Sequence, residues 1–140
     1  MIDAQAPLQA AIVAAVKADA GLGALIADRI YDRVPTNGSG QVNATFPYVS
    51  FGPMQSVPSD DECHDGVEVF VQIDAWSRKV GTVEVREIVA GLTRLLDAAL
   101  TVTGFEVVTF EVQSARTGRE PDGLTSRGIV QLRYELAPNT

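Results

Sequence analysis

The feature that most constrains the fold of this chain is an amphipathic segment in its second half. Its apolar residues recur at i, i+3, i+4 and i+7, the spacing of one face of an α-helix. They are Val85, Ile88, Val89, Leu92, Leu95, Leu96 and Ala99. The other side carries Glu84, Arg86, Glu87, Thr93, Arg94 and Asp97. A helix with one apolar stripe has to bury it, so we expect a helix from Glu84 to Leu100 packed on an apolar sheet face.

Alternating segments supply that sheet face. Val67, Val69, Val71 and Ile73 keep a strict period of two, which indicates a strand with one buried face. Further strands are expected over Phe46–Met54, over Phe105–Arg116 with Val108, Phe110 and Val112 on one face, and over Arg127–Leu136 with Val130, Leu132, Tyr134 and Leu136 on one face. The last two strands are joined by a hairpin-type connection, Thr117–Leu124, which contains Asp122-Gly123.

The N-terminal third adds a second helix. Between Pro7 and Asp19, apolar residues again follow helical spacing, and proline is well tolerated in the first helical turn. Leu22–Ala27 is expected to form a short turn, Arg29–Val34 a short extended piece, and Pro35–Gln41 a loop rich in turn-forming residues.

Together these elements predict an α+β fold, in which two helices pack on one face of a mainly antiparallel sheet of about four to five strands. The chain has 140 residues, and neither a linker nor a repeat divides it. A chain of this length favours one domain, residues 1–140, that buries about two-thirds of the surface exposed by its unfolded form.

The charge and the cysteine content of the chain limit the classes of function that it can have. Eleven basic and eighteen acidic residues give a formal charge of −7, which disfavours nonspecific binding to DNA, RNA or anionic lipid. Cys63 is the only cysteine, so neither an intramolecular disulfide nor a thiolate metal cluster can form. No apolar stretch approaches the roughly 20 residues that cross a bilayer, and no nucleotide-binding motif is present. We therefore expect no cofactor and no membrane partner.

The densest group of potentially reactive residues is an acidic run: Asp60, Asp61, Glu62, Cys63, His64 and Asp65. Consecutive side chains cannot all face one ion unless the backbone coils around it, and the alternating ligands and glycine of a calcium loop are missing. Adjacent cysteine and histidine rarely reach the geometry of a nucleophile and its base. We interpret Gln55–Gly66 as a solvated acidic connection, and a small metal-dependent hydrolase is the least favoured alternative.

Two groups of residues are candidate subunit contacts. Trp76 and Arg78 end the alternating strand; the tryptophan either covers the end of the sheet or anchors, with the arginine, a contact between subunits. Arg116, Arg119 and Arg127 flank the predicted hairpin, where ordinary surface charge is the simpler reading and docking on a neighbouring subunit the alternative. No group of residues makes a credible active site.

Several segments, in their order along the chain, resemble a known family. They are Leu8-Gln9-Ala10-Ala11-Ile12, Gly21-Leu22-Gly23-Ala24-Leu25, Arg29-Ile30-Tyr31-Asp32-Arg33-Val34-Pro35, Phe46-Pro47-Tyr48-Val49-Ser50-Phe51-Gly52, Asp74-Ala75-Trp76-Ser77-Arg78, the helix from Glu84 to Leu100, Ser114-Ala115-Arg116, Pro121-Asp122-Gly123 and Arg127-Gly128-Ile129-Val130. This pattern, spread over Leu8 to Leu136, resembles the tail-completion family of siphophages, prophages and gene transfer agents.

The resemblance implies an α+β fold similar to the lambda-like tail terminators. Such proteins form hexameric rings on the last ring of the tail tube, stop its growth and offer a surface to the head connector. The implied partners are therefore other copies of the chain, the tube protein and the connector, at the tail–neck junction of a particle assembled in the bacterial cytoplasm. A neck protein, either stopper or adaptor, is the alternative.

The acidic run is not part of the family pattern. A conduit for DNA should not bind its cargo, and acidic side chains at a lumen repel phosphates. Asp60, Asp61, Glu62 and Asp65 are accordingly candidates to line or border the channel, through which DNA passes without specific binding.

Overall fold

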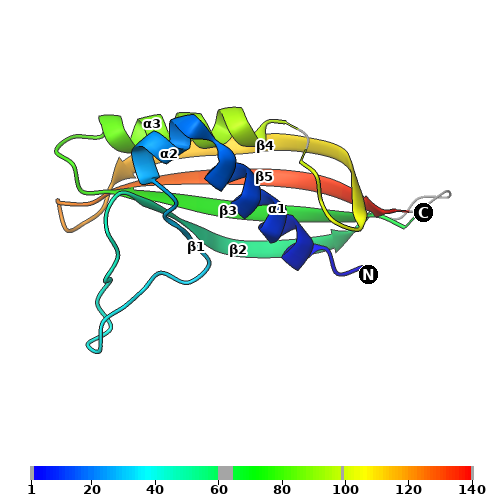
Figure 1. Cartoon of the computed structure of the whole chain (residues 1–140), viewed down its shortest axis with the longest axis horizontal. Helices are drawn as coiled ribbons and strands as arrows, with labels where there is room; N and C mark the ends of the chain where they lie inside the picture. The colour runs from blue at the N-terminus through cyan, green and yellow to red at the C-terminus, as the bar shows by residue number, and fades with distance from the viewer. Residues whose placement is uncertain (1, 60–64, 99, 140) are drawn as a thin grey trace.

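The computed structural model describes residues 2–59, 65–98 and 100–139, and a five-stranded sheet forms its centre (Figure 1). The strands are β1 (Ile30–Tyr31), β2 (Tyr48–Pro58), β3 (Val67–Ser77), β4 (Phe105–Arg119) and β5 (Ser126–Pro138). Their order is β1-β2-β3-β5-β4. The predicted antiparallel pairing is confirmed for β2 to β5, but β1 pairs in parallel with β2, so the sheet is mixed.

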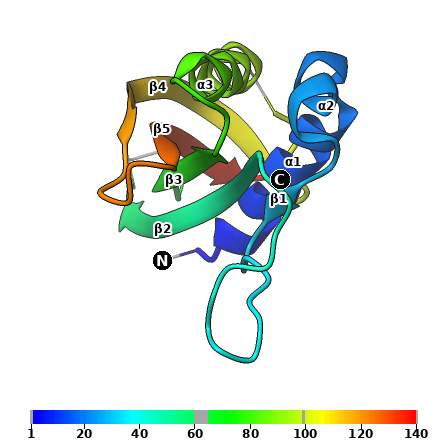
Figure 2. The ribbon, with the colours of Figure 1, turned by 90° about the vertical axis from the view of Figure 1, so that its left-hand side faces the viewer.

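Three helices in the described part of the chain lie on the same side of the sheet (Figure 2). They are α1 (Gln5–Ala18), α2 (Ala20–Ile26) and α3 (Val83–Leu96). The sequence predicted only two, because Leu22–Ala27 was expected to be a turn. That expectation is wrong: the Asp19 carboxylate accepts a hydrogen bond from the Leu22 amide at 2.9 Å and caps α2. Leu22 and Ile26 are then fully buried.

The core lies between the helices and the inner face of the sheet. The predicted alternation is confirmed in β3, where Val67, Val69, Val71 and Ile73 are buried, and in the four inward residues predicted for β5. Strand β4 differs, because Val108 is 43% exposed instead of facing inward with Phe110 and Val112. Register shifts between Val107 and Thr109, and between Val112 and Ser114, explain the difference: each bulge changes which residues face the core.

The strands are longer than predicted. β2 continues to Pro58, so Gln55–Pro58 is strand and not part of an acidic connection. β4 reaches Arg119 and β5 reaches Pro138, which leaves residues 120–125 as the hairpin turn. Conversely α3 ends at Leu96, and Ala99 lies outside the described residues.

The second face of the sheet carries no helix, and a long excursion leaves the body between β1 and β2. Within it, residues 35–43 are all exposed and project well beyond the sheet (Figures 1 and 2). We call residues 35–43 the arm. The helix-free face and the arm are therefore surfaces that the helices leave uncovered.

Candidate assembly surfaces

Aromatic rings and arginines gather at the end of the sheet where the β4–β5 turn lies, which we call the hairpin end. The register pairs Tyr48 of β2 with Trp76 of β3, and Trp76 with Arg127 of β5, so the three side chains share the helix-free face. The rings of Tyr48 and Trp76 are stacked with centroids 6.3 Å apart. The guanidinium carbon of Arg127 lies 4.8 Å from the centroid of the Trp76 ring, a cation–π geometry.

This cluster extends toward the arm through Phe46, whose ring centroid lies 4.9 Å from that of Tyr48. The guanidinium carbon of Arg78 lies 4.3 Å from the centre of the Phe46 ring. A groove of about 390 Å³ opens here between the base of the arm and the hairpin turn, with Val34, Val42 and Pro121 among its lining residues. Tryptophan, tyrosine and arginine are residue types enriched in protein interfaces, and here Trp76 is partly exposed and Arg78 exposed, whereas Tyr48 is buried beside them.

An ion pair between a partly exposed arginine and a nearly buried aspartate supports the cluster. Asp74 is 5% exposed, and its Oδ2 lies 3.2 Å from Nη2 of Arg127. Gln72 donates to the other oxygen of Asp74 at 3.1 Å. Within the described residues, Nε of Arg127 is buried without a hydrogen-bond partner, whereas Nη2 of the same guanidinium is paired with the Asp74 carboxylate.

The β4–β5 turn next to the groove is held by side-chain hydrogen bonds. Oδ1 of Asp122 accepts hydrogen bonds from the amides of Leu124 and Thr125, both at 2.8 Å, and Oδ2 accepts from the Thr125 hydroxyl at 2.7 Å. These hydrogen bonds lower the pKa of Asp122, and the one from the Thr125 hydroxyl has the largest effect. Arg78 Nε donates to the same hydroxyl at 3.3 Å. The turn nevertheless presents Leu124, an apolar side chain, with 72% of its surface exposed.

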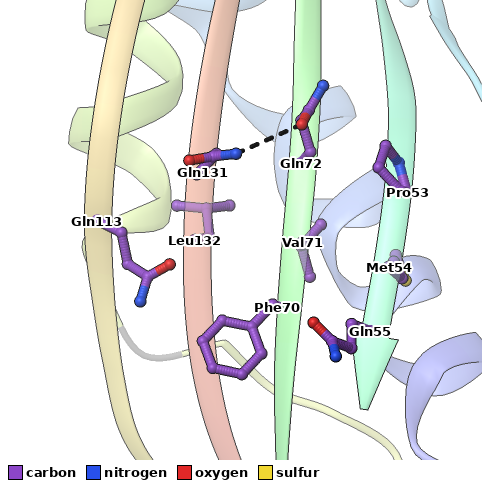
Figure 3. A pocket seen from close by; sticks show the side chains of 9 residues that line it. All are labelled: Pro53, Met54, Gln55, Phe70, Val71, Gln72, Gln113, Gln131 and Leu132. Carbon is purple, nitrogen blue, oxygen red and sulfur yellow. Dashed lines mark hydrogen bonds between the residues drawn. The ribbon is translucent and has the colours of Figure 1, made fainter.

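The middle of the helix-free face is uncharged and combines amide side chains with apolar ones. Four glutamines, Gln55, Gln72, Gln113 and Gln131, surround Phe70 over a hollow of about 300 Å³ (Figure 3). Nε2 of Gln131 donates to Oε1 of Gln72 at 3.5 Å, across β5 and β3. Neutral amides of this kind offer no strong attraction for phosphate.

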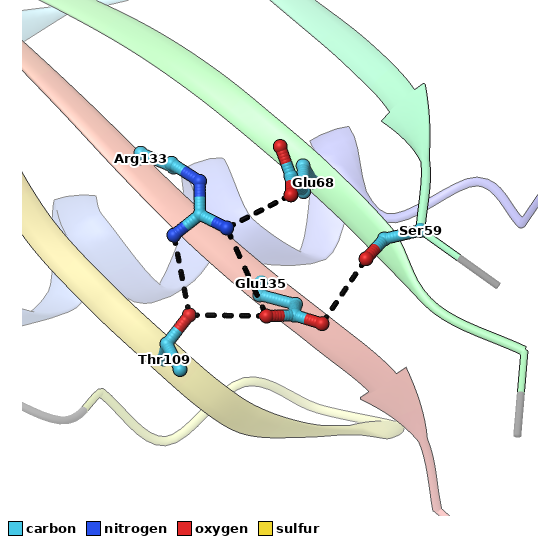
Figure 4. A network of polar contacts seen from close by, with 5 residues as sticks. All are labelled: Ser59, Glu68, Thr109, Arg133 and Glu135. Atoms are coloured by element: carbon cyan, nitrogen blue, oxygen red, sulfur yellow. Dashed lines mark hydrogen bonds and ion pairs between the residues drawn. The ribbon is translucent and has the colours of Figure 1, made fainter. Parts of the chain in front are cut away.

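The far end of the same face holds a charged network (Figure 4). Nη2 of Arg133 lies 2.8 Å from Oε1 of Glu68 and 3.8 Å from Oε2 of Glu135. Glu135 also accepts from the Ser59 hydroxyl at 3.1 Å and from the Thr109 hydroxyl at 3.2 Å. The network joins β3, β5 and β4 to the segment that follows β2. The hydrogen bond from Arg133 lowers the pKa of Glu68 below its usual value of 4.5.

Acid should therefore weaken the fold through Glu68. Its folded-state pKa is lowered, so its contribution to stability is present above about pH 4.5 and is lost as the pH falls through the folded-state value. We expect the urea midpoint of the wild type to fall more steeply between pH 5 and pH 3 than that of Glu68→Gln. Glu106→Gln, which removes an exposed carboxylate of β4 outside the network, is the control and should follow the wild type. Parallel curves for Glu68→Gln and the wild type would count against the ion pair.

The predicted site residues fall into three groups. Trp76, Arg78 and Arg127 lie together in the aromatic cluster, whereas Arg116 and Arg119 are exposed on β4 at the edge of the sheet. Asp65 is exposed and lies in the segment that connects β2 to β3. Asp60, Asp61 and Glu62 lie outside the described residues, so their proposed position at a channel stays a prediction.

Sequence reasoning missed Phe46, Tyr48 and Asp74 as partners in the cluster. Phe46 and Tyr48 are aromatic residues on either side of Pro47, and Asp74 is an acidic residue inside an apolar strand. Each of them therefore stands out in the sequence. Only the strand register, which pairs Tyr48 with Trp76 and Ser50 with Asp74, shows that they meet. In the described parts of the chain, no three His, Cys, Asp or Glu side chains are placed to hold a metal ion.

Across residues 2–59, 65–98 and 100–139, no single helix is long and apolar enough to cross a membrane. In this part of the chain, only α1 and α2 taken together have the length and apolar composition of a span, and they are bent by 85° at their junction.

The whole architecture is found in a known particle. The chain is similar to a chain in the virion of a native gene transfer agent particle, with a TM-score of 0.85 and 23% sequence identity. The match covers 98% of this chain and 99% of that chain, so the two share one fold from end to end. No curated protein sequence matches this chain significantly. The fold is thus one used by a virion protein.

The family of this chain is shown by the match of its sequence to a family model. The chain belongs to the family described as tail completion protein gp17, whose model matches residues 10–135. Members of this family are structural proteins of phage-type tails, so the resemblance noted in the sequence is confirmed and the protein is assigned a structural role in a tail.

Proposed function

We propose that this protein is a tail terminator that forms a hexameric ring, caps the tail tube, stops its polymerisation and provides the surface to which the head or neck attaches. The observation that carries this proposal is the family match over residues 10–135. The shared fold with a virion chain over nearly its entire length supports it. In this proposal the whole chain, residues 1–140, acts as one terminator domain at the tail–neck junction of a particle built in the host cytoplasm.

A ring that ends a polymer must present two different faces, one to the tube and one to the connector. Repeated head-to-tail contacts between identical subunits make such a ring, because each subunit uses two different surfaces toward its neighbours. Trp76, Arg78 and Arg127 in the aromatic cluster, and Arg116 and Arg119 at the β4 edge, are the side chains that we assign to subunit contacts.

The ring must also let DNA pass without retaining it. The chain carries a formal charge of −7, and the middle of the helix-free face offers neutral amides around Phe70. Asp65, with Asp60, Asp61 and Glu62 of the same connection, is proposed to border the channel and to repel phosphate there. DNA is then cargo and not a specific ligand.

Deleting the gene tests the proposal. We expect a lysate that contains overlong tubes without heads beside heads without tails, seen by negative-stain electron microscopy. The physical reason is that without a cap nothing stops the addition of further tube rings. The matched control is the same strain with the gene supplied in trans, which should restore particles of uniform tail length.

Two other outcomes have definite meanings. Tails of normal length lying detached from heads would show that growth is terminated elsewhere and would move the protein to the neck, as a stopper or adaptor. Intact particles in the deletion strain would contradict any assembly role at this junction.

A further inference from the structure

The arm keeps a defined shape although all nine of its residues are exposed. Asn37 and Gln41 close a small hairpin, because the Asn37 amide donates to the Gln41 carbonyl at 2.8 Å. The Asn37 side-chain oxygen accepts from the amides of Ser39, at 2.9 Å, and Gln41, at 3.0 Å. An antiparallel bridge joins Thr36 to Val42. An arm that is already formed loses little conformational entropy when it docks.

The composition of the arm favours another copy of this chain as its partner. From Val34 to Thr45 there is no charged residue, although the chain as a whole carries −7. A neutral arm can approach an acidic copy without repulsion and without burying an unpaired charge. Val42 lies in this stretch and is 45% exposed, so the arm also offers apolar surface that its own body does not cover.

A complementary surface exists at the opposite edge of the sheet. β4 has 15 residues and pairs with β5 on one side, while no strand in the described residues pairs with its other side. Val108 on this strand is 43% exposed. Unpaired edge strands are templates for adding a strand from another chain.

The strand order places these two features on opposite edges. The arm leaves the molecule next to β1 and β2, and β4 is the last strand at the other side (Figure 2). A contact between unlike edges repeats in one direction from copy to copy, which is how a ring closes. β4 also carries Arg116 and Arg119, two of the side chains already assigned to subunit contacts.

We propose that the arm of one copy docks along the free edge of β4 in the next copy, with residues 41–45 adding an extended strand to the neighbour's sheet. The proposal rests on the ring proposed above and names the contact that builds it. The exposed valines, Val42 of the arm and Val108 of the neighbouring edge, then come to lie in the same buried contact.

Cysteine cross-linking tests this arrangement in assembled particles. In a Cys63→Ser background, Val42→Cys is combined in turn with Val108→Cys, Gln113→Cys or Ala115→Cys, which scan the exposed positions of β4. After mild oxidation, we expect at least one pair to give a ladder of bands above the dimer on a non-reducing gel. Val42→Cys alone, or with Ala10→Cys on the exposed side of α1, should give no band above the dimer.

A second variant asks whether the contact matters for assembly. Val42→Asp places a charge in the neutral arm and should reduce the fraction of subunits in rings by about tenfold or more, because that charge becomes buried without a partner. Val42→Thr, which keeps the β-branched shape, should assemble. Both variants should melt at the temperature of the wild-type subunit, which separates lost assembly from lost folding.

The outcomes distinguish this inference from the proposed function. If rings form on tails while no pair cross-links beyond the dimer and Val42→Asp still assembles, the arm contact is wrong and the terminator remains. Cross-links from Val42→Cys to the tube protein instead of to another copy would likewise overturn it. If the wild type forms no ring on tails at all, the proposed function itself fails.

Discussion

Replacing Gly128 with alanine is expected to lower the free energy of unfolding by about 1–3 kcal/mol, the usual cost of overpacking a core. Gly128 lies on the inner face of β5, where α3 comes close to the sheet. A Cβ atom at this position would collide with Cγ2 of Val89 and would lie 3.5 Å from the Cβ of Ala75. Valine in a helix has one strongly preferred rotamer, so Val89 cannot easily turn away.

The matched control is Gly118→Ala, on the neighbouring strand. No atom outside its chain neighbours lies within 4 Å of the Cβ that alanine would add there, so the change should alter stability by less than about 0.5 kcal/mol. Adding Val89→Ala to Gly128→Ala should recover part of the loss, which a double-mutant cycle in urea measures. Equal urea midpoints for Gly128→Ala and the wild type would mean that α3 does not approach β5 this closely.

The elements with strong periodicity could be predicted from sequence because one face of each is buried along its whole length. Val67 to Ile73 in β3, and Val85 to Leu96 in α3, are of this kind. Repeated burial at regular spacing leaves a pattern that needs no knowledge of the rest of the fold. The packing of the helices on one face of the sheet then follows, because the apolar surface of one has to cover the apolar surface of the other.

The elements that were missed depend on contacts between distant residues. α2 has only seven residues, two of them glycines, and its start is capped by Asp19, which also receives a hydrogen bond from Arg94 of α3 at 2.9 Å. The parallel pairing of β1 with β2 likewise depends on tertiary contacts. One of them is the hydrogen bond that Arg29 Nε donates to the Pro47 carbonyl at 2.8 Å. The bulges in β4 also depend on contacts between distant residues, and they change which residues of this strand face the core.

The candidate interface was predicted in part. Trp76, Arg78 and Arg127 were singled out by residue type and do lie together, but their role in subunit contacts stays a prediction. Their joint position depends on the register of three strands, which one extra residue in a turn would have changed. The arm was expected as a loop over Pro35–Gln41, but its projection away from the body is visible only in three dimensions (Figure 1).

Tyr134 connects the centre of the sheet to the end of α3. It is the largest of the fully buried side chains, and its hydroxyl donates to the Leu96 carbonyl at 3.1 Å. That carbonyl belongs to the last turn of the helix, where backbone acceptors lack partners within the helix. The bond therefore satisfies an acceptor that lies in the core, and the ring fills the space around it.

Truncation of this side chain should separate the two contributions. Tyr134→Ala is expected to lower the free energy of unfolding by about 3–5 kcal/mol, because a large cavity opens in a well-packed core. Tyr134→Phe keeps the ring and leaves only the Leu96 carbonyl without its donor, at a cost of about 1–2 kcal/mol. Urea unfolding of both variants measures the difference, and similar midpoints for the two would mean that packing of the ring contributes little.

The dependence of stability on alkaline pH provides a second, independent test of the role of Tyr134. Burial raises the pKa of Tyr134 above its usual value of 10, so the folded protein keeps this phenol neutral while the unfolded chain ionises it. The stabilisation is fully present below pH 10 and declines as the pH rises above it. We expect the urea midpoint of the wild type to fall between pH 9 and pH 11 more steeply than that of Tyr134→Phe. A slope equal to that of the wild type would mean that ionisation of the buried Tyr134 does not cause the loss of stability at alkaline pH.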